Sequence, residues 1–138
     1  MAELVRERIL DAITTAVSGE YDTPEPVDEA QLPITLVSDE VDEGSIDEYG
    51  IATVVTPVVI GRAELTSEKS LTNKRRHAHR MYGALYTEMF EDESFGGLVE
   101  SVEMINGAIA IESSKFVYAE IRFAVTWKHV HGDPFSQA

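Results

Sequence analysis

The sequence predicts one α+β domain, residues 1–138, that combines two helices with a mostly antiparallel sheet. Residues 3–18 and 67–91 repeat apolar side chains at helical spacing, whereas residues 117–128 alternate apolar and polar side chains like a strand with one buried face. The Asn106–Gly107 pair lies between two short apolar segments and is typical of a tight antiparallel turn. A chain of 138 residues is long enough to bury one ordinary core.

The first helix is predicted over residues 3–18, where apolar side chains gather on one side and charged side chains on the other. Gly19 follows directly and is expected to end the helix, because glycine readily adopts the left-handed conformation found after many helices. Residues 20–32 are polar and acidic and contain two prolines. We therefore expect an exposed acidic loop there.

Two strands and a second acidic loop are predicted next. Residues 34–37 form a short strand, and residues 38–50 carry six acidic side chains whose mutual repulsion favours a solvated, mobile loop. Residues 51–60 are almost continuously β-branched, which favours a strand with both faces covered. Pro57 cannot donate a backbone hydrogen bond, so it indicates an edge strand or a bulge.

The second helix is predicted over residues 67–91, with Ser67 as its cap. Its apolar stripe consists of Leu71, Ala78, Met81, Tyr82, Leu85 and Met89. After the helix, residues 98–105 and 108–113 flank Asn106–Gly107 and are predicted to form a hairpin with a type I′ turn.

The last strand is predicted over residues 117–128, after a short turn at residues 113–115. The side chains expected to face the core are Val117, Ala119, Ile121, Phe123, Val125 and Trp127. Twelve residues extend about 40 Å, which is longer than most strands of a small sheet. We therefore expect part of this strand to reach beyond its own sheet and to pair with another subunit.

Charge is abundant and unevenly placed. The chain has 25 acidic and 11 basic residues, a formal net charge of −14, and no cysteine. Eleven of the acidic residues lie within residues 20–48, and five of the basic ones lie within residues 69–80. The acidic excess opposes tight binding of nucleic acid, and the absence of cysteine excludes disulfides and thiolate metal sites.

No apolar run is long enough to span a membrane, and no secretory signal pattern begins the chain, so we expect a cytoplasmic protein.

Histidines are the candidates for metal binding. His129 and His131 would share one face of a strand and could approach one ion with Asp133 as a third ligand. The simpler alternative is two exposed imidazoles before a turn. His77 and His79 lie about 200° apart around a helix and cannot converge on one ion.

The basic cluster of the second helix consists of Lys74, Arg75, Arg76 and Arg80. It could bind phosphate or DNA, or it could be a solvated helix face. We favour a contact with carboxylates of another subunit, because this chain carries a large acidic surplus. The sequence contains no nucleophile elbow and no phosphate-binding glycine loop, so we expect no enzymatic activity and no cofactor.

The order of these elements resembles the tail terminator proteins of long-tailed phages. The resemblance lies in the short first helix, the Leu32–Val37 entry strand with its acidic loop, the long central helix, and a last strand that runs through Trp127-Lys128-His129 to Gly132-Asp133-Pro134-Phe135. It covers nearly the whole chain.

The resemblance implies a four- to five-stranded, mostly antiparallel sheet with two helices packed on one face, in a subunit that forms a ring. The ring, of six copies, would cap the tail tube, stop its polymerisation and offer the joining surface to the head connector, while the genome passes through the lumen without specific binding. The protein would lie at the head-proximal end of the tail in the virion, after assembly in the host cytoplasm. The candidate interface residues are Lys74, Arg75, Arg76, Arg80, Arg122, Trp127, Lys128, Asp133, Pro134 and Phe135.

Three alternatives remain open from the sequence. One is another ring protein of the neck or of tail completion. Another is a small metalloenzyme that uses His129, His131 and Asp133. The third is a binding module that works as a monomer.

Overall fold

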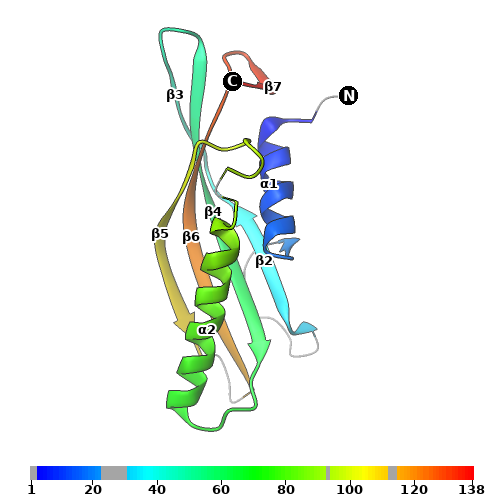
Figure 1. Ribbon diagram of the computed structural model, residues 1–138, viewed down its shortest axis with the longest axis vertical. Coiled ribbons are helices and arrows are strands. Elements are labelled where there is room, and N and C mark those ends of the chain that lie inside the picture. Colours follow the sequence, from blue (N-terminus) through cyan, green and yellow to red (C-terminus); the bar gives the residue numbers. More distant parts are fainter. Residues whose placement is uncertain (1–2, 23–30, 93, 112–114) are drawn as a thin grey trace.

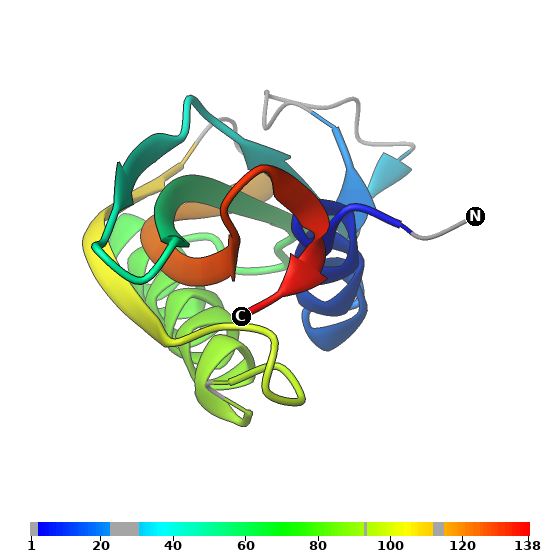
Figure 2. The ribbon, with the colours of Figure 1, turned by 90° about the horizontal axis from the view of Figure 1, so that it is seen from above.

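The computed structural model describes residues 3–22, 31–92, 94–111 and 115–138. Two helices lie on one face of a curved sheet (Figures 1 and 2), which confirms the predicted α+β class and its layers. The elements are α1 (Val5–Ala16), β1 (Glu20–Tyr21), β2 (Ile34–Asp39), β3 (Glu43–Ile46), β4 (Ile51–Leu65), α2 (Leu71–Phe90), β5 (Ser101–Ala110), β6 (Phe116–Val130) and β7 (Asp133–Gln137).

The sheet is larger than predicted, because the described residues form seven strands instead of four or five. Five strands follow the order β1-β2-β4-β6-β5, while β3 pairs with β4 and β7 pairs with β6. The short β1 lies parallel to β2, so the sheet is mixed, although every other pairing is antiparallel. The additional strands β1, β3 and β7 have two to five residues each, too few for a clear alternating pattern in the sequence.

The core lies between the two helices and the inner face of β4 and β6. All six side chains predicted to face inward from β6 are at most 3% exposed, which confirms that face of the strand. Phe123 is fully buried, and its ring centroid lies 6.0 Å from that of Phe90 and 6.3 Å from that of Tyr86. From the other helix, Val5 and Ile13 are fully buried in the same cluster.

Both helices are found where the sequence predicts them, but their ends differ. After α1, Ser18 rather than Gly19 adopts a positive φ, of 52°, and the Gly19 amide donates to the Thr14 carbonyl at 2.9 Å. Gly19 is needed for another reason, because a Cβ there would lie 3.0 Å from the Thr35 carbonyl oxygen of β2. The cap of α2 is Ser70 instead of Ser67, since the Ser70 hydroxyl accepts a hydrogen bond from the Asn73 amide.

Strand β4 is a central strand, so the edge position inferred from Pro57 is wrong. β2 pairs with β4 up to Val58, and β3 begins its pairing at Val55. Pro57 lies in the interval between these two partners, where its carbonyl accepts a hydrogen bond from the Glu40 amide at 2.8 Å. In a strand the N–H and C=O of one residue point to the same side, so an N–H at position 57 would face the connection between β2 and β3 and not a paired strand. Proline is therefore tolerated at this position.

The hairpin predicted at Asn106–Gly107 is also wrong. Strand β5 runs through both residues, which pair with Arg122 and Ile121 of β6, and a bulge lies between Met104 and Asn106. A Cβ at Gly107 would lie 2.6 Å from the Tyr82 hydroxyl oxygen of α2. The side chain of Tyr82 therefore occupies the space that a Cβ at position 107 would need. Residues 111–115 connect β5 to β6, and most of the turn predicted at residues 113–115 lies outside the described ranges, because residues 112–114 are not described.

The two segments predicted as acidic loops, residues 38–50 and residues 20–32, both contain strand residues in the structure. Residues 38–50 are not one continuous loop, because β2 extends to Asp39 and Glu43–Ile46 forms β3 against β4. Of the segment 20–32, Glu20 and Tyr21 form β1, and residues 23–30 lie outside the described residues.

Strand β6 does reach beyond the helices, but this chain itself supplies its partners. β4 pairs with it from Leu65 to Ile51, over all fifteen residues of β6, and β7 pairs with its end. No second subunit is required to complete this ladder.

Candidate assembly surface

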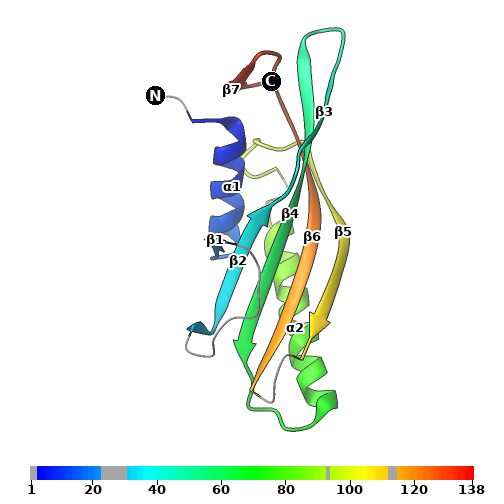
Figure 3. The same ribbon diagram turned by 180° about the vertical axis from the view of Figure 1, so that it is seen from behind.

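A β-hairpin projects beyond the helices at the end of the molecule opposite the start of α2 (Figures 1 and 3). We call it the arm and define it as residues 43–55, which comprise β3, the turn and the first part of β4. All four residues of β3 are exposed. Two of the arm's large apolar side chains are also exposed, Ile46 at 58% and Tyr49 at 80%.

The tip of the arm is an ordered turn. The Asp47 carboxylate accepts hydrogen bonds from the backbone amides of Tyr49, at 2.8 Å, and Ile51, at 3.0 Å. Gly50 closes the turn with a φ of +76°, a conformation that suits glycine. The turn thus presents the side chains of Glu48 and Tyr49 to solvent in a defined position.

A chain of hydrogen bonds fixes the base of the arm to the core. The Trp127 indole Nε1 donates to the Thr56 hydroxyl at 2.9 Å, and that hydroxyl donates to the Asp42 carboxylate at 2.7 Å. Arg6 of α1 donates from Nε to the same carboxylate at 3.0 Å. Trp127 is 3% exposed, so this candidate interface residue supports the arm from within the core rather than from the surface.

A second polar cluster lies beside the base, where α1 meets the edge of the sheet. Asp39 accepts hydrogen bonds from the Tyr21 hydroxyl and pairs with the Arg6 guanidinium. Burial opposes the charged form of Asp39, but these two partners outweigh burial and lower the pKa of Asp39. The same hydrogen bond raises the pKa of Tyr21.

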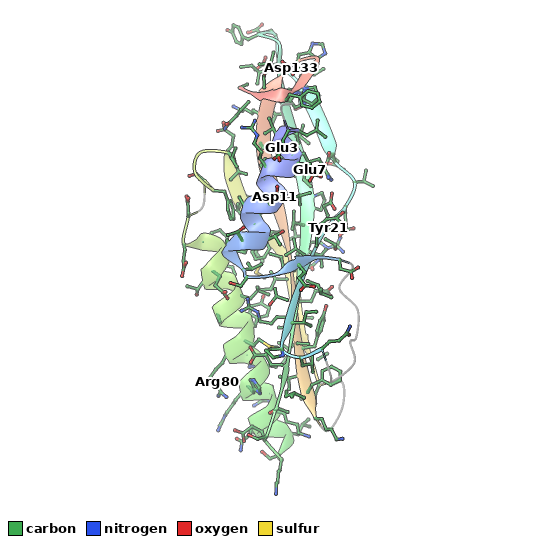
Figure 4. The ribbon with its side chains drawn as sticks, turned by 90° about the vertical axis from the view of Figure 1, so that its right-hand side faces the viewer. Glu3, Glu7, Asp11, Tyr21, Arg80 and Asp133 are labelled. Atoms are coloured by element: carbon green, nitrogen blue, oxygen red, sulfur yellow. The ribbon has the colours of Figure 1, made fainter. Side chains whose placement is uncertain are left out.

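The basic cluster lies at the opposite end of the molecule, on the first half of α2. Figure 4 shows Arg80 far from Asp133 and from the acidic side chains of α1. Arg75, Arg76 and Arg80 are exposed and Lys74 is half-buried. Within the described ranges none of the four forms a salt bridge, whereas His77 of the same helix contacts Glu64 at 3.0 Å.

A hollow of about 270 Å³ lies beside this cluster, between the first turn of α2 and the end of β5. It is lined by Leu71, Thr72, Arg75, Ile109, Ala110 and Ile111. Leu71, which the sequence places in the buried stripe of the helix, is 71% exposed here. The hollow therefore combines apolar walls with a guanidinium group.

The remaining candidate interface residues lie on the outer face of β6 and at the C-terminus. Arg122 contacts Glu40 at 2.8 Å, and both side chains are about 40% exposed. Lys128 is half-buried on the same face. Near the end of the chain Pro134 is half-buried and Phe135 is 44% exposed.

The structure does not bring together the metal ligands suggested by the sequence. The Asp133 carboxylate is engaged by the Phe135 amide and the Ser136 hydroxyl, and His129 Nδ1 lies 2.8 Å from the neighbouring Val130 carbonyl oxygen. His131 is exposed. Among the described residues, no group of three histidine or carboxylate side chains could hold a metal ion.

Three features were not predicted from the sequence: the arm, the chain of hydrogen bonds from Asp42 through Thr56 to Trp127, and the hollow. The arm had a local signal, because Asp47 and Gly50 supply the residues of a tight turn between Ile46 and Ile51. The other two features join residues that are distant in the sequence, and no local pattern indicates such contacts.

No family model and no curated protein matches the sequence. A search of solved structures finds a similar chain in the virion of a native gene transfer agent particle. The match has a TM-score of 0.37 and 13% identity, and it covers 89% of this chain and 90% of the other. No helix in the described part of the chain is long and apolar enough to cross a membrane.

Proposed function

We propose that this protein is a structural component of a phage virion that forms a ring of six copies on the end of the tail tube. The observation that carries the proposal is the pair of unlike surfaces at opposite ends of one subunit, the acidic arm and the basic cluster with its hollow. Contacts between unlike surfaces join copies head to tail, and they close into a ring when the rotation between copies permits.

The order of elements supports the same role. The first helix, the entry strand, the long central helix and the last strand are all present in the order that resembles tail terminators. In such a role the ring stops polymerisation of the tube protein and offers a surface to the head connector. The proposed role is non-enzymatic and requires no cofactor, and its location is the head-proximal end of the tail after assembly in the host cytoplasm.

The net charge of −14 suits a ring through which a genome passes. A basic lumen would hold DNA by releasing its counterions, whereas carboxylates repel the phosphate backbone and let it slide. We therefore propose that DNA crosses the ring without specific binding.

Capping of tubes tests the proposal. The purified chain is added to polymerising tail tube protein of the same phage, and tube lengths are measured by electron microscopy. We expect the mean length to fall as the ratio of this chain to tube protein rises. The Phe123→Asp variant, which places a charge in the core, serves as the inactive control. Unchanged tube lengths would contradict the terminator role, and rings that bind only the connector protein would instead identify another neck component.

A further inference from the structure

We infer that the arm of one copy docks into the hollow at the start of α2 of the next copy, with Tyr49 in the hollow and Glu48 against Arg75. This inference rests on the proposed ring and names the contact that builds it. The molecule that fills the hollow is a second copy of this chain, because both halves of a complementary contact, the arm and the hollow, are present on one subunit.

The arm supplies an apolar anchor with an acidic border. Tyr49 is 80% exposed and Ile46 is 58% exposed, at a turn that is held by hydrogen bonds. Exposed tyrosines on an ordered turn are effective interface anchors, because they bury a large area with little loss of side-chain freedom. Glu48 and Glu43 are exposed beside them and form no salt bridge in the described part of the chain.

The hollow supplies the matching apolar walls and the opposite charge. Ile109 and Ile111 line one side and the exposed Leu71 lines the other. Arg75 lies at the hollow, and Arg76 is its neighbour in the chain. The N-terminus of α2 adds the positive end of a helix dipole, which also favours carboxylates.

The contact cannot form within one copy. The tip of the arm and the start of α2 lie at opposite ends of β4, and fifteen residues of strand extend about 50 Å. The ladder between β4 and β6 and the hydrogen bonds of Thr56 with Asp42 and Trp127 keep the arm from folding back. The partner of the arm is therefore another molecule, and the contact is head to tail.

Cysteine cross-linking tests the geometry directly, because the chain has no cysteine of its own. A Glu48→Cys and Thr72→Cys double variant is assembled on tubes, oxidised and analysed on a non-reducing gel. We expect disulfide-linked species of up to six copies. The matched control is Glu48→Cys with Ala84→Cys, an exposed position on α2 about 18 Å further along the helix. The control pair is expected to remain uncross-linked.

Charge reversal tests the pairing independently. Glu48→Lys and Arg75→Glu are each expected to weaken ring formation at least tenfold, because each opposes like charges across the contact. An equal mixture of the two variants is expected to restore rings, since alternating copies then meet opposite charges at every contact. Unchanged thermal unfolding of each variant shows that folding is not the cause.

The outcomes separate this inference from the proposed function. Rings that cap tubes without the Glu48–Thr72 cross-link, or single variants that assemble as well as the unmodified chain, overturn the arm contact and leave the ring intact. Failure of the unmodified chain to bind or cap tubes overturns the proposed function itself.

Discussion

Gly107 provides a stringent test of how the helix layer packs on β5. An alanine Cβ at this position would lie 2.6 Å from the Tyr82 hydroxyl oxygen, 2.8 Å from Cε2 and 3.0 Å from Cζ. Displacing the ring costs about 1–3 kcal/mol as overpacking. Alanine also restricts the unfolded chain, which offsets about 0.4–1 kcal/mol. The difference between these two ranges is about 0–2.6 kcal/mol, so we expect Gly107→Ala to lower the free energy of unfolding by about 1.3 kcal/mol, the middle of that range.

The assay is urea unfolding of four proteins: the unmodified chain, Gly107→Ala, Tyr82→Leu and the double variant. Leucine removes the part of the ring that meets the new Cβ. In that background Gly107→Ala is expected to be neutral or slightly stabilising, so the two changes are coupled by about 1–2 kcal/mol. If Gly107 lay instead in a type I′ turn, alanine would be strained by its positive φ whatever residue stood at position 82. An equal cost in both backgrounds would refute the packing described here.

Three further outcomes are expected. Phe123→Asp should abolish cooperative unfolding measured by circular dichroism, because it buries a charge, while Arg122→Asp on the outer face should leave the fold intact. Trp127→Phe should cost about 1–2 kcal/mol in urea unfolding, because the Thr56 hydroxyl loses its donor. The lowered pKa of Asp39 means that its contribution to stability is present above pH 4 and is lost as pH falls through the folded value. Asp39→Asn should therefore lose less stability between pH 6 and pH 2.5 than the unmodified chain, and an equal loss would contradict this assignment.

The parts of the fold that the sequence predicts are those with a long, regular pattern. The alternation along β6 assigns its buried face correctly, from Val117 to Trp127, because a strand with one buried face must alternate. The predicted stripe of α2 is buried at Ala78, Met81, Leu85 and Met89, whereas Leu71 in the first turn is 71% exposed and Tyr82 is half-buried. A long apolar pattern remains recognisable even where one or two of its positions depart from it.

The errors fall where one residue type has more than one physical use. The pair Asn106–Gly107 is typical of a tight turn. Here it lies within β5, and glycine suits position 107 because the Tyr82 side chain packs where a Cβ would lie. Pro57 commonly indicates an edge, but here it lies opposite an interval between two partner strands. Such choices are decided by contacts between distant elements, which no local pattern contains.

Only the basic half of the candidate assembly surface was predictable from the sequence. The exposed basic cluster was evident from its density, since lysine and arginine crowd residues 69–80. Its acidic counterpart was predicted as a mobile loop, because six carboxylates suggest self-repulsion. The structure shows how much of that charge is used: Asp39 and Asp42 bind Arg6, Glu40 pairs with Arg122, and Asp47 holds the turn. The contacts of Asp39, Glu40 and Asp42 fix the segment that leads into the arm, and those of Asp47 order the turn at its tip.

We propose that copies of this chain close into a ring at the end of a tail tube. Electron microscopy of capped tubes, with averaged end-on views, tests it most directly. We expect a single ring of six copies at the tube end and no protein along the tube wall. Tube ends that lack the protein, or protein distributed along the wall, would contradict the claim.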